Sequence, residues 1–331
     1  MRAPERPGGG RTRRLKPLYG LASLSGGAVR SPFTRPMPHK KHIIRRMAVP
    51  FTVVTALLGA GVLPALADAR PSSVTPESRQ GRVGGDPRDV GAKIFKGQAF
   101  DTCHTPSSSV MRAWYGTSPF GAVGVYIGGR ARACPNEPNL TGDWVRTVDR
   151  TGWKLLPVYV GSQSPCVRAQ NKRRHAMSHS RPAQRGATEG RDAVQQAKKL
   201  RMGKHSAVYL DMESYDNSDT KCAATTLHFI QGWNRAVRKA GYIPGFYSSA
   251  DSGIEHMEGA RKAGRKDLPH MLWFARWRVP ASLNNENYLD KKAWQPHRRI
   301  HQYDGNVKRT YGGHTLNIDR NLMDAPVAVV R

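Results

Sequence analysis

The 331-residue sequence is poor in acidic residues and cysteine, and it shows neither a heptad nor a Gly-X-Y repeat. The missing repeats exclude a coiled-coil rod and a collagen-like fibre. Asp and Glu number 24 against 53 Lys and Arg, a formal net charge of +29 at pH 7. This excess favours an anionic partner: a wall polymer, a membrane surface or nucleic acid. Hydrophobic residues make up 38% of the chain, which is enough for a core and excludes a fully disordered protein.

Signatures of several ligand classes are missing as well. No RRM, zinc-finger or helix-turn-helix pattern is present, so charge alone supports a nucleic-acid partner and we expect none. No Gly-x-Gly-x-x-Gly follows an early strand, which removes the main support for a dinucleotide cofactor. The four cysteines lack Cys-x-x-Cys spacing, and His175 and His179 lie in a very polar segment. We therefore expect no metal and no cofactor.

The N-terminal residues are expected to lie outside the folded domain. Residues 48–66 form an uncharged apolar stretch, preceded by basic residues and followed by small-x-small cleavage sites. This pattern predicts a signal peptide, which we assign to residues 37–69 because Met37 is a natural start. Residues 1–36 are then a mistranslated or disordered leader. Residues 70–93, rich in Ser, Pro and Gly, are predicted to be a linker.

Export leads to further expectations. A transmembrane helix is the alternative for the apolar stretch, but Gly59, Gly61 and Pro64 weaken its end, so we expect no membrane span after cleavage. Arg45-Arg46 makes the twin-arginine route an alternative to general secretion. We expect a monomer that is secreted or associated with the cell wall. An even number of cysteines in an exported protein predicts two disulfides, with three pairings open among Cys103, Cys134, Cys166 and Cys222.

From residue 94 onward, short apolar runs alternate with helical patterns. Helical spacing predicts helices over residues 192–200 and 226–240, whereas the basic residues 167–190 are predicted to be a long surface loop. Eight strand-like runs end in polar residues or glycine: 97–102, 122–128, 154–161, 207–213, 242–248, 271–277, 299–304 and 316–320. This alternation predicts a parallel sheet of the α/β class, and eight units over residues 94–331 fit a single (β/α)8 TIM-like barrel. An open doubly wound sheet is the alternative.

Acidic residues lie at the strand ends, where such barrels keep their active sites. Asp101 ends the first run, Asp211 and Glu213 end the fourth, and Asp319 lies in the eighth. Because residues i and i+2 of a strand point the same way, Asp211 and Glu213 can face one cavity. Crowding of partly desolvated carboxyl groups raises at least one pKa, which gives the protonated and ionised pair that glycoside cleavage needs. The alternative is that these acids form buried ion pairs with Arg or Lys.

Aromatic residues lie among these acids. Sugar rings stack on aromatic faces, so we predict substrate contacts from Tyr159, Tyr247, Trp277 and Tyr303. Tyr209 and Trp273 are assigned to the core or the rim, because the sequence does not fix on which face of their strands they lie relative to the acids.

Motifs fall at all eight strand ends, among them Phe100-Asp101-Thr102-Cys103, Tyr209-Leu210-Asp211-Met212-Glu213, His301-Gln302-Tyr303-Asp304 and Ile318-Asp319-Arg320-Asn321. They resemble the secreted, largely actinobacterial glycoside-hydrolase-like family, long described as a domain of unknown function. The resemblance extends over residues 94–331. That family is similar in turn to the family 25 glycoside hydrolases, the Chalaropsis-type lysozymes, which cleave the muramyl–glucosaminyl bond of peptidoglycan.

The resemblance implies a role for each acid. Glu213 becomes the general acid, and Asp211 its partner, which orients water or the acetamido group of the substrate. Asp101 and Asp319 would shape the charge of the site.

The resemblance also implies that Gln302 and Tyr303 contact sugar. The family's cysteine pattern implies the disulfides Cys103–Cys134 and Cys166–Cys222. The basic segment 167–190 has no recognised counterpart in the lysozymes and is expected to narrow or change the cleft.

Two functions stay open at this point. The first is an exported glycosidase that acts on peptidoglycan or another cell-wall glycan by carboxylate general acid/base catalysis. The second is a non-catalytic barrel that binds the same glycan, because fold does not guarantee chemistry.

Overall fold

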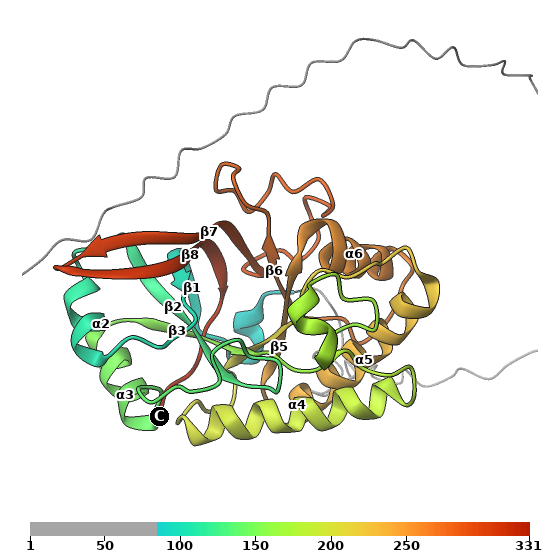
Figure 1. The fold of residues 1–331 in the computed structure, drawn as a ribbon, viewed down its shortest axis with the longest axis horizontal. Coiled ribbons are helices and arrows are strands. Elements are labelled where there is room, and N and C mark those ends of the chain that lie inside the picture. Colours follow the sequence, from blue (N-terminus) through green and yellow to red (C-terminus); the bar gives the residue numbers. More distant parts are fainter. Residues whose placement is uncertain (1–84) are drawn as a thin grey trace, which may run out of the picture. The chain divides into compact units, whose positions relative to one another are not determined.

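The computed structural model describes residues 85–331, whose eight strands form a closed barrel in chain order (Figure 1). The leader, the signal peptide and most of the linker expected from the sequence lie outside the described residues. The strands are β1 (Ile94–Asp101), β2 (Phe120–Gly128), β3 (Lys154–Tyr159), β4 (Ala207–Asp211), β5 (Ile243–Ser249), β6 (Met271–Ala275), β7 (Arg299–Tyr311) and β8 (His314–Pro326). Each strand overlaps one of the eight predicted runs, so the predicted barrel is confirmed.

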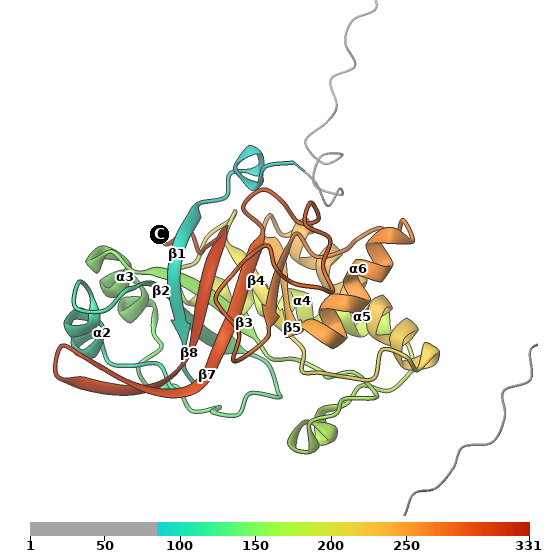
Figure 2. The ribbon, with the colours of Figure 1, turned by 90° about the horizontal axis from the view of Figure 1, so that it is seen from above.

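Helices follow the first five strands. Figure 2 shows α2 and α3 on one side of the barrel and α4, α5 and α6 on the other. The α-helices are α2 (Ser108–Trp114), α3 (Gly142–Thr151), α4 (Pro182–Lys199), α5 (Thr220–Lys239) and α6 (Glu255–Lys262). Shorter turns are η1 (Pro87–Val90), η2 (Gln170–His175) and η3 (Ala250–Ile254). Within residues 85–331, no helix has the length and apolar character needed to cross a membrane.

One strand departs from the expected parallel barrel. β8 runs antiparallel to both of its neighbours, β7 and β1. A two-residue turn joins β7 to β8, and its residues Gly312 and Gly313 have φ values of 54° and 79°, as a type I′ hairpin requires. The predicted seventh and eighth runs are too close in sequence for a parallel crossover, which needs about a dozen residues or more. The hairpin is the physical consequence of this short connection.

Alternation along the strands builds two hydrophobic layers. Inward side chains such as Leu156, Tyr209 and Trp273 fill the barrel, whereas outward ones such as Leu210 pack against the helices. In β4, Tyr209 faces inward and Leu210 outward. The inward row therefore continues to Asp211 and, just beyond the strand, to the cavity-lining Glu213.

The basic segment 167–190 is only partly a loop, which corrects the expectation for it. Residues 182–190 form the first half of α4, with Pro182 in the first turn. Their glycines and polar residues look like a loop in sequence, but Gly186 permits close packing of α4 on α5. A Cβ at Gly186 would lie 2.0 Å from the carbonyl oxygen of Phe229. Earlier in the segment, η2 turns back over the barrel and buries Lys172.

Candidate active site

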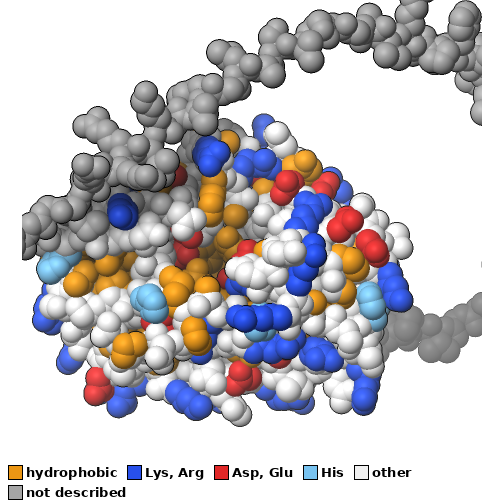
Figure 3. All heavy atoms as spheres, in the orientation of Figure 1, with side chains coloured by type: hydrophobic (Ala, Val, Ile, Leu, Met, Phe, Trp, Pro, Cys, Tyr) orange, Lys and Arg blue, Asp and Glu red, His pale blue; other side chains and the backbone are white. Residues whose placement is uncertain are grey.

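A cavity of about 670 Å³ lies at the carboxyl ends of the parallel strands. It is lined by all four acids predicted from the sequence: Asp101, Asp211, Glu213 and Asp319. Asp319 reaches this end because β8 is reversed, which sets it opposite Asp101 in the antiparallel ladder. Figure 3 shows that Lys and Arg side chains are spread widely over one face of the molecule, so this gathering of acids contrasts with a basic exterior.

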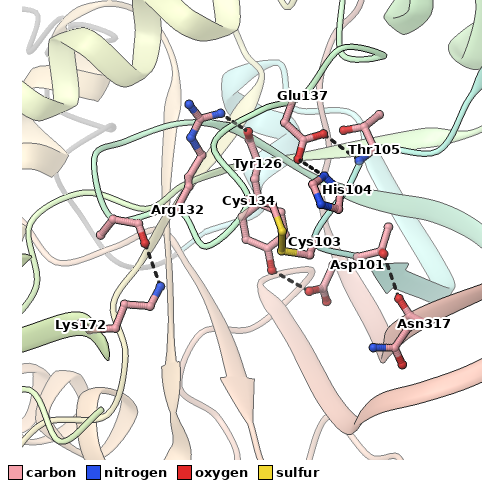
Figure 4. Close-up of a disulfide and its surroundings, with 12 residues drawn as sticks. Asp101, Cys103, His104, Thr105, Tyr126, Arg132, Cys134, Glu137, Lys172 and Asn317 are labelled. Atoms are coloured by element: carbon pink, nitrogen blue, oxygen red, sulfur yellow. Dashed lines mark hydrogen bonds and ion pairs between the residues drawn. A yellow bond between two sulfur atoms is a disulfide. The ribbon is translucent and has the colours of Figure 1, made fainter. Parts of the chain in front are cut away.

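Asp101 is a fully hydrogen-bonded carboxylate. The Tyr126 hydroxyl donates to Oδ1 at 2.8 Å, an interaction drawn in Figure 4, and Oδ2 accepts from Asn321 Nδ2 at 2.8 Å and Gln302 Nε2 at 3.1 Å. The side chain fits because Gly124 lies beside it, where a Cβ would approach the Asp101 Cβ to 2.6 Å. Burial raises the pKa of Asp101, and the three donors oppose this rise.

Aromatic donors orient the two amides that bind Asp101. Tyr247 Oη and Trp277 Nε1 each donate to Gln302 Oε1 at 2.9 Å. Trp273 Nε1 donates to Asn321 Oδ1 at 2.7 Å. Because each amide oxygen is occupied in this way, its NH2 group turns toward the carboxylate. The structure thus brings the predicted Tyr247, Trp277 and Gln302 together at Asp101, although none of the three is among the residues that line the cavity.

Asp211 is buried but incompletely hydrogen-bonded. Its side-chain Oδ1 is inaccessible to solvent and has no hydrogen-bond partner. Burial, and secondarily the nearby charge of Glu213, raise the pKa of Asp211 well above its usual value. Gln163 fixes this strand end, since its Nε2 donates to the Asp211 carbonyl at 3.2 Å and its Oε1 accepts from the Glu213 amide at 2.8 Å.

Glu213 has a basic neighbour. Lys172 Nζ from η2 lies 3.4 Å from Glu213 Oε1 and donates to the Ala131 carbonyl at 2.9 Å, the bond drawn from Lys172 in Figure 4. Among residues 85–331, this is the only ion pair made by any of the four acids. The alternative of buried ion pairs therefore applies to one acid of the four.

Asp319 lies across the cavity on β8. Its Oδ1 accepts from the Asn306 amide at 2.6 Å. Burial, with a smaller contribution from the charge of Asp101, raises the pKa of Asp319 to about 7. The cavity therefore contains a carboxyl group that titrates near neutral pH.

Two of the predicted sugar contacts lie elsewhere. Tyr159 points outward to α4, where its hydroxyl donates to Asp192 Oδ2 at 2.7 Å. Tyr303 follows the inward Gln302 in β7 and so faces the opposite side of the sheet, where its hydroxyl donates to Gln98 Oε1 and Arg320 stacks on its ring. Neither side chain lines the cavity, contrary to the expectation.

The two disulfides have the pairing implied by the resemblance. Cys103–Cys134 lines the cavity and is shown in Figure 4. Cys166–Cys222 joins the segment before η2 to α5.

Four contributors were missed in the sequence: Tyr126, Gln163, Lys172 and Asn321. Asn321 carried a usable signal, because it lies two residues after Asp319 on the same face of a strand. Tyr126 could have been placed by the same alternation within β2. Gln163 and Lys172 lie in the β3–α4 connection, whose path no local pattern specifies.

Three solved structures are similar to this chain at low sequence identity. An uncharacterized protein from B. stearothermophilus is 18% identical, with a TM-score of 0.43 over 69% of this chain and 95% of its own. The Tat-secreted protein Rv2525c of Mycobacterium tuberculosis, in complex with L-tartrate, is 14% identical, with a TM-score of 0.45 over 69% and 96%. The modular autolysin LytC of Streptococcus pneumoniae is 14% identical, with a TM-score of 0.43 over 70% and 46%.

No curated protein matches this chain. A family model does: the one described as Rv2525c-like, glycoside hydrolase-like domain covers residues 112–323, from within α2 to within β8. This range includes Asp211, Glu213 and Asp319 and most of the barrel. The chain therefore belongs to the Rv2525c-like glycoside hydrolase-like family.

Proposed function

We propose that this domain is an exported glycoside hydrolase that acts on peptidoglycan or another cell-wall glycan by carboxylate general acid/base catalysis. The observation that carries the proposal is the convergence of Asp101, Asp211, Glu213 and Asp319 on one cavity. The pKa values of Asp101, Asp211 and Asp319 are raised. These carboxyl groups therefore hold a proton at a pH where ordinary carboxyl groups are ionised. Glycoside cleavage uses this coexistence of proton donor and carboxylate.

The walls of the cavity support a sugar ligand. Its volume falls within the range of about 300–1,000 Å³ that is usual for ligand sites. Trp277 lies outside the lining of the cavity, but it is 40% exposed and donates to Gln302, which binds the cavity-lining Asp101. Aromatic faces of this kind stack on sugar rings.

We assign the proposed roles starting from Asp211 and Glu213, the Asp-x-Glu pair at the end of β4. Glu213 acts as general acid, since its side chain is one-third exposed and lines the cavity. Asp211, which lines the cavity beside Glu213, orients the acetamido group of the substrate or water. Asp101 and Asp319 set the charge around the reacting sugar.

The test is product analysis by mass spectrometry after incubation with defined wall-glycan fragments. We expect the wild-type protein to release shorter saccharides, and Glu213→Gln to abolish release while glycan binding persists. No product at any pH between about 4 and 8 contradicts the hydrolase proposal, because a catalytic carboxyl pair titrates within this window.

A non-catalytic glycan-binding barrel is the second candidate, and the Lys172–Glu213 ion pair favours it. This ion pair engages Glu213, the proposed general acid, with an ammonium group inside the cavity. On this alternative, wild-type protein binds the fragments but leaves them intact.

We also propose that the protein acts outside the cytoplasm, secreted or bound to the cell wall. Two disulfides fit an oxidising compartment. The residues after 69 hold 41 Lys and Arg against 22 Asp and Glu, a net charge of +19 that would attract anionic wall polymers, and this attraction weakens with salt. N-terminal sequencing of the exported protein tests the expected cleavage near residue 69.

A further inference from the structure

Lys172 is a buried cation that faces the acidic cavity. The residue is 7% exposed, and its only carboxylate partner among the described residues is Glu213. One N–H of the ammonium group is used by the Ala131 carbonyl at 2.9 Å. The contact with Glu213 Oε1, at 3.4 Å, is longer than the roughly 2.7–2.9 Å of a strong charge-assisted hydrogen bond. Lys172 therefore has donor capacity left toward the cavity that it lines.

The backbone that carries Lys172 is fastened at both ends. Before η2, the disulfide Cys166–Cys222 and the bond from the Arg168 amide to the Ser214 carbonyl tie the segment to its neighbours. After η2, the His175 carbonyl and the Met177 amide pair with the backbone of Gln163. The same Gln163 binds the strand end that carries Glu213. The lysine is thus fixed, and the partly exposed Glu213 side chain is the partner that can move.

The surroundings of Lys172 favour an incoming anion. Arg168, Arg173 and Arg174 flank it, all exposed and none within ion-pair distance of a carboxylate among the described residues. Their positive charges favour a negatively charged group near Lys172, whereas the acids that line the cavity would repel it.

We propose that Lys172 is the specificity-determining residue of this cavity: it exchanges Glu213 for a carboxylate carried by the bound sugar and so releases Glu213 for the reaction. The inference rests on the proposed binding of a glycan in the cavity. Exchange of one carboxylate for another keeps the buried ammonium paired. A neutral sugar has no carboxylate to replace that of Glu213. Glu213 then stays paired with Lys172 and is not released for the reaction.

The experiment compares two ligands that differ in charge but not in length. One is a tetrasaccharide of alternating N-acetylglucosamine and N-acetylmuramic acid with free lactyl carboxylates, and the other is its methyl ester. Tryptophan fluorescence in a stopped-flow instrument records binding before products form. We expect the wild-type protein to bind the acid about tenfold or more tightly than the ester, as for a hydrogen bond to a charged group. The ratio should persist at high salt, because the pairing group is buried.

Variants assign this preference to one residue. Lys172→Met should bring the ratio of the two affinities close to one, whereas Lys172→Arg should keep it. Lys198→Met removes the same charge from the exposed end of α4 and should leave the ratio unchanged. Thermal unfolding of each variant shows that it is folded.

A ratio near one in the wild-type protein overturns the inference, as does a ratio that survives in Lys172→Met or is lost equally in Lys198→Met. Cleavage of the tetrasaccharides is scored separately. If the wild-type protein prefers the acid over the ester but cleaves neither, the hydrolase proposal is contradicted and this inference stands. Cleavage with a ratio near one contradicts this inference alone.

Discussion

Asp101 and Asp211 are both buried aspartates at strand ends of the same cavity, yet their hydrogen bonding differs. Asp101 accepts three hydrogen bonds from side chains, whereas Asp211 has an inaccessible oxygen with no partner. Buried polar atoms are nearly always hydrogen-bonded in folded proteins, so the second arrangement is the unusual one. Asp101 is therefore the centre of a hydrogen-bonded cavity wall, whereas the carboxyl group of Asp211 has hydrogen-bonding capacity that the fold leaves unused.

The two sides of the cavity also differ in how many partners their acidic residues have. On the β1–β8 side, Asp101 is the end point of hydrogen bonds that start at Trp273, Trp277 and Tyr247 and pass through amides. On the β4 side, the partners of the acids are few and include the movable Glu213–Lys172 contact. We therefore expect loss of the Asp101 carboxylate to act chiefly on stability, and loss of a carboxyl group on the β4 side to remove function.

Asp101→Ala should have the largest effect on stability. It leaves the Tyr126 hydroxyl and the amides of Gln302 and Asn321 without their acceptor. Each unsatisfied buried donor costs about 1–3 kcal/mol, so the free energy of unfolding should fall by about 3 kcal/mol or more. Denaturant unfolding measures this loss. Asp101→Asn keeps one acceptor oxygen and should cost less, and a loss no larger than that of a surface substitution would refute the structural role of Asp101.

Asp211→Asn should act in the opposite direction on stability. The folded pKa of Asp211 lies well above the ordinary 3.8, so the folded state keeps a proton that the unfolded state releases. The carboxyl group therefore contributes a stability loss that grows as pH rises above 3.8 and is complete above the folded pKa. Because asparagine does not ionise, the variant should melt at a higher temperature than the wild type at neutral pH and lose this advantage well below pH 3.8.

The same Asp211→Asn variant should lose turnover. General acid–base groups contribute typically about 10²–10⁴-fold to rate, and an amide cannot take the place of the carboxyl group. A variant that is both more stable and inactive would sharpen the contrast with Asp101. A destabilised variant would show that Oδ1 is satisfied in solution after all.

Asp319→Asn should give a smaller effect confined to a defined pH range. The pKa of Asp319 is raised from 3.8 to about 7, so the stability contributed by its protonated form is lost as pH rises through this window. The asparagine variant keeps an acceptor for the Asn306 amide and should flatten the decline. Melting temperatures of both proteins from acidic to alkaline pH test this, and parallel curves would contradict it.

The sequence predicted the barrel and its acids because both depend on local regularities. Runs of apolar residues located all eight strands, and the i, i+2 rule placed Asp211 and Glu213 on one face. The same rule applied to Gln302 and Tyr303 would have shown that neighbouring residues of a strand cannot both face inward. The sequence did not predict Lys172 as a cavity residue, because its position depends on the path of the β3–α4 connection. A disulfide and Gln163, which are not local sequence features, set that path. The reversal of β8 follows from the short connection between β7 and β8.

Tyr159→Phe should have the smallest effect, and it tests the boundary of the site. The hydroxyl of Tyr159 donates to Asp192 behind the barrel wall, so its loss should cost about 1 kcal/mol of stability and leave glycan binding unchanged. Tyr247→Phe is the matched change on the inner face, where it removes a donor to Gln302 Oε1. Gln302 can then rotate and weaken its bond to Asp101, so we expect Tyr247→Phe to lower glycan affinity. Equal losses of affinity in the two variants would show that the outward face of β3 belongs to the site.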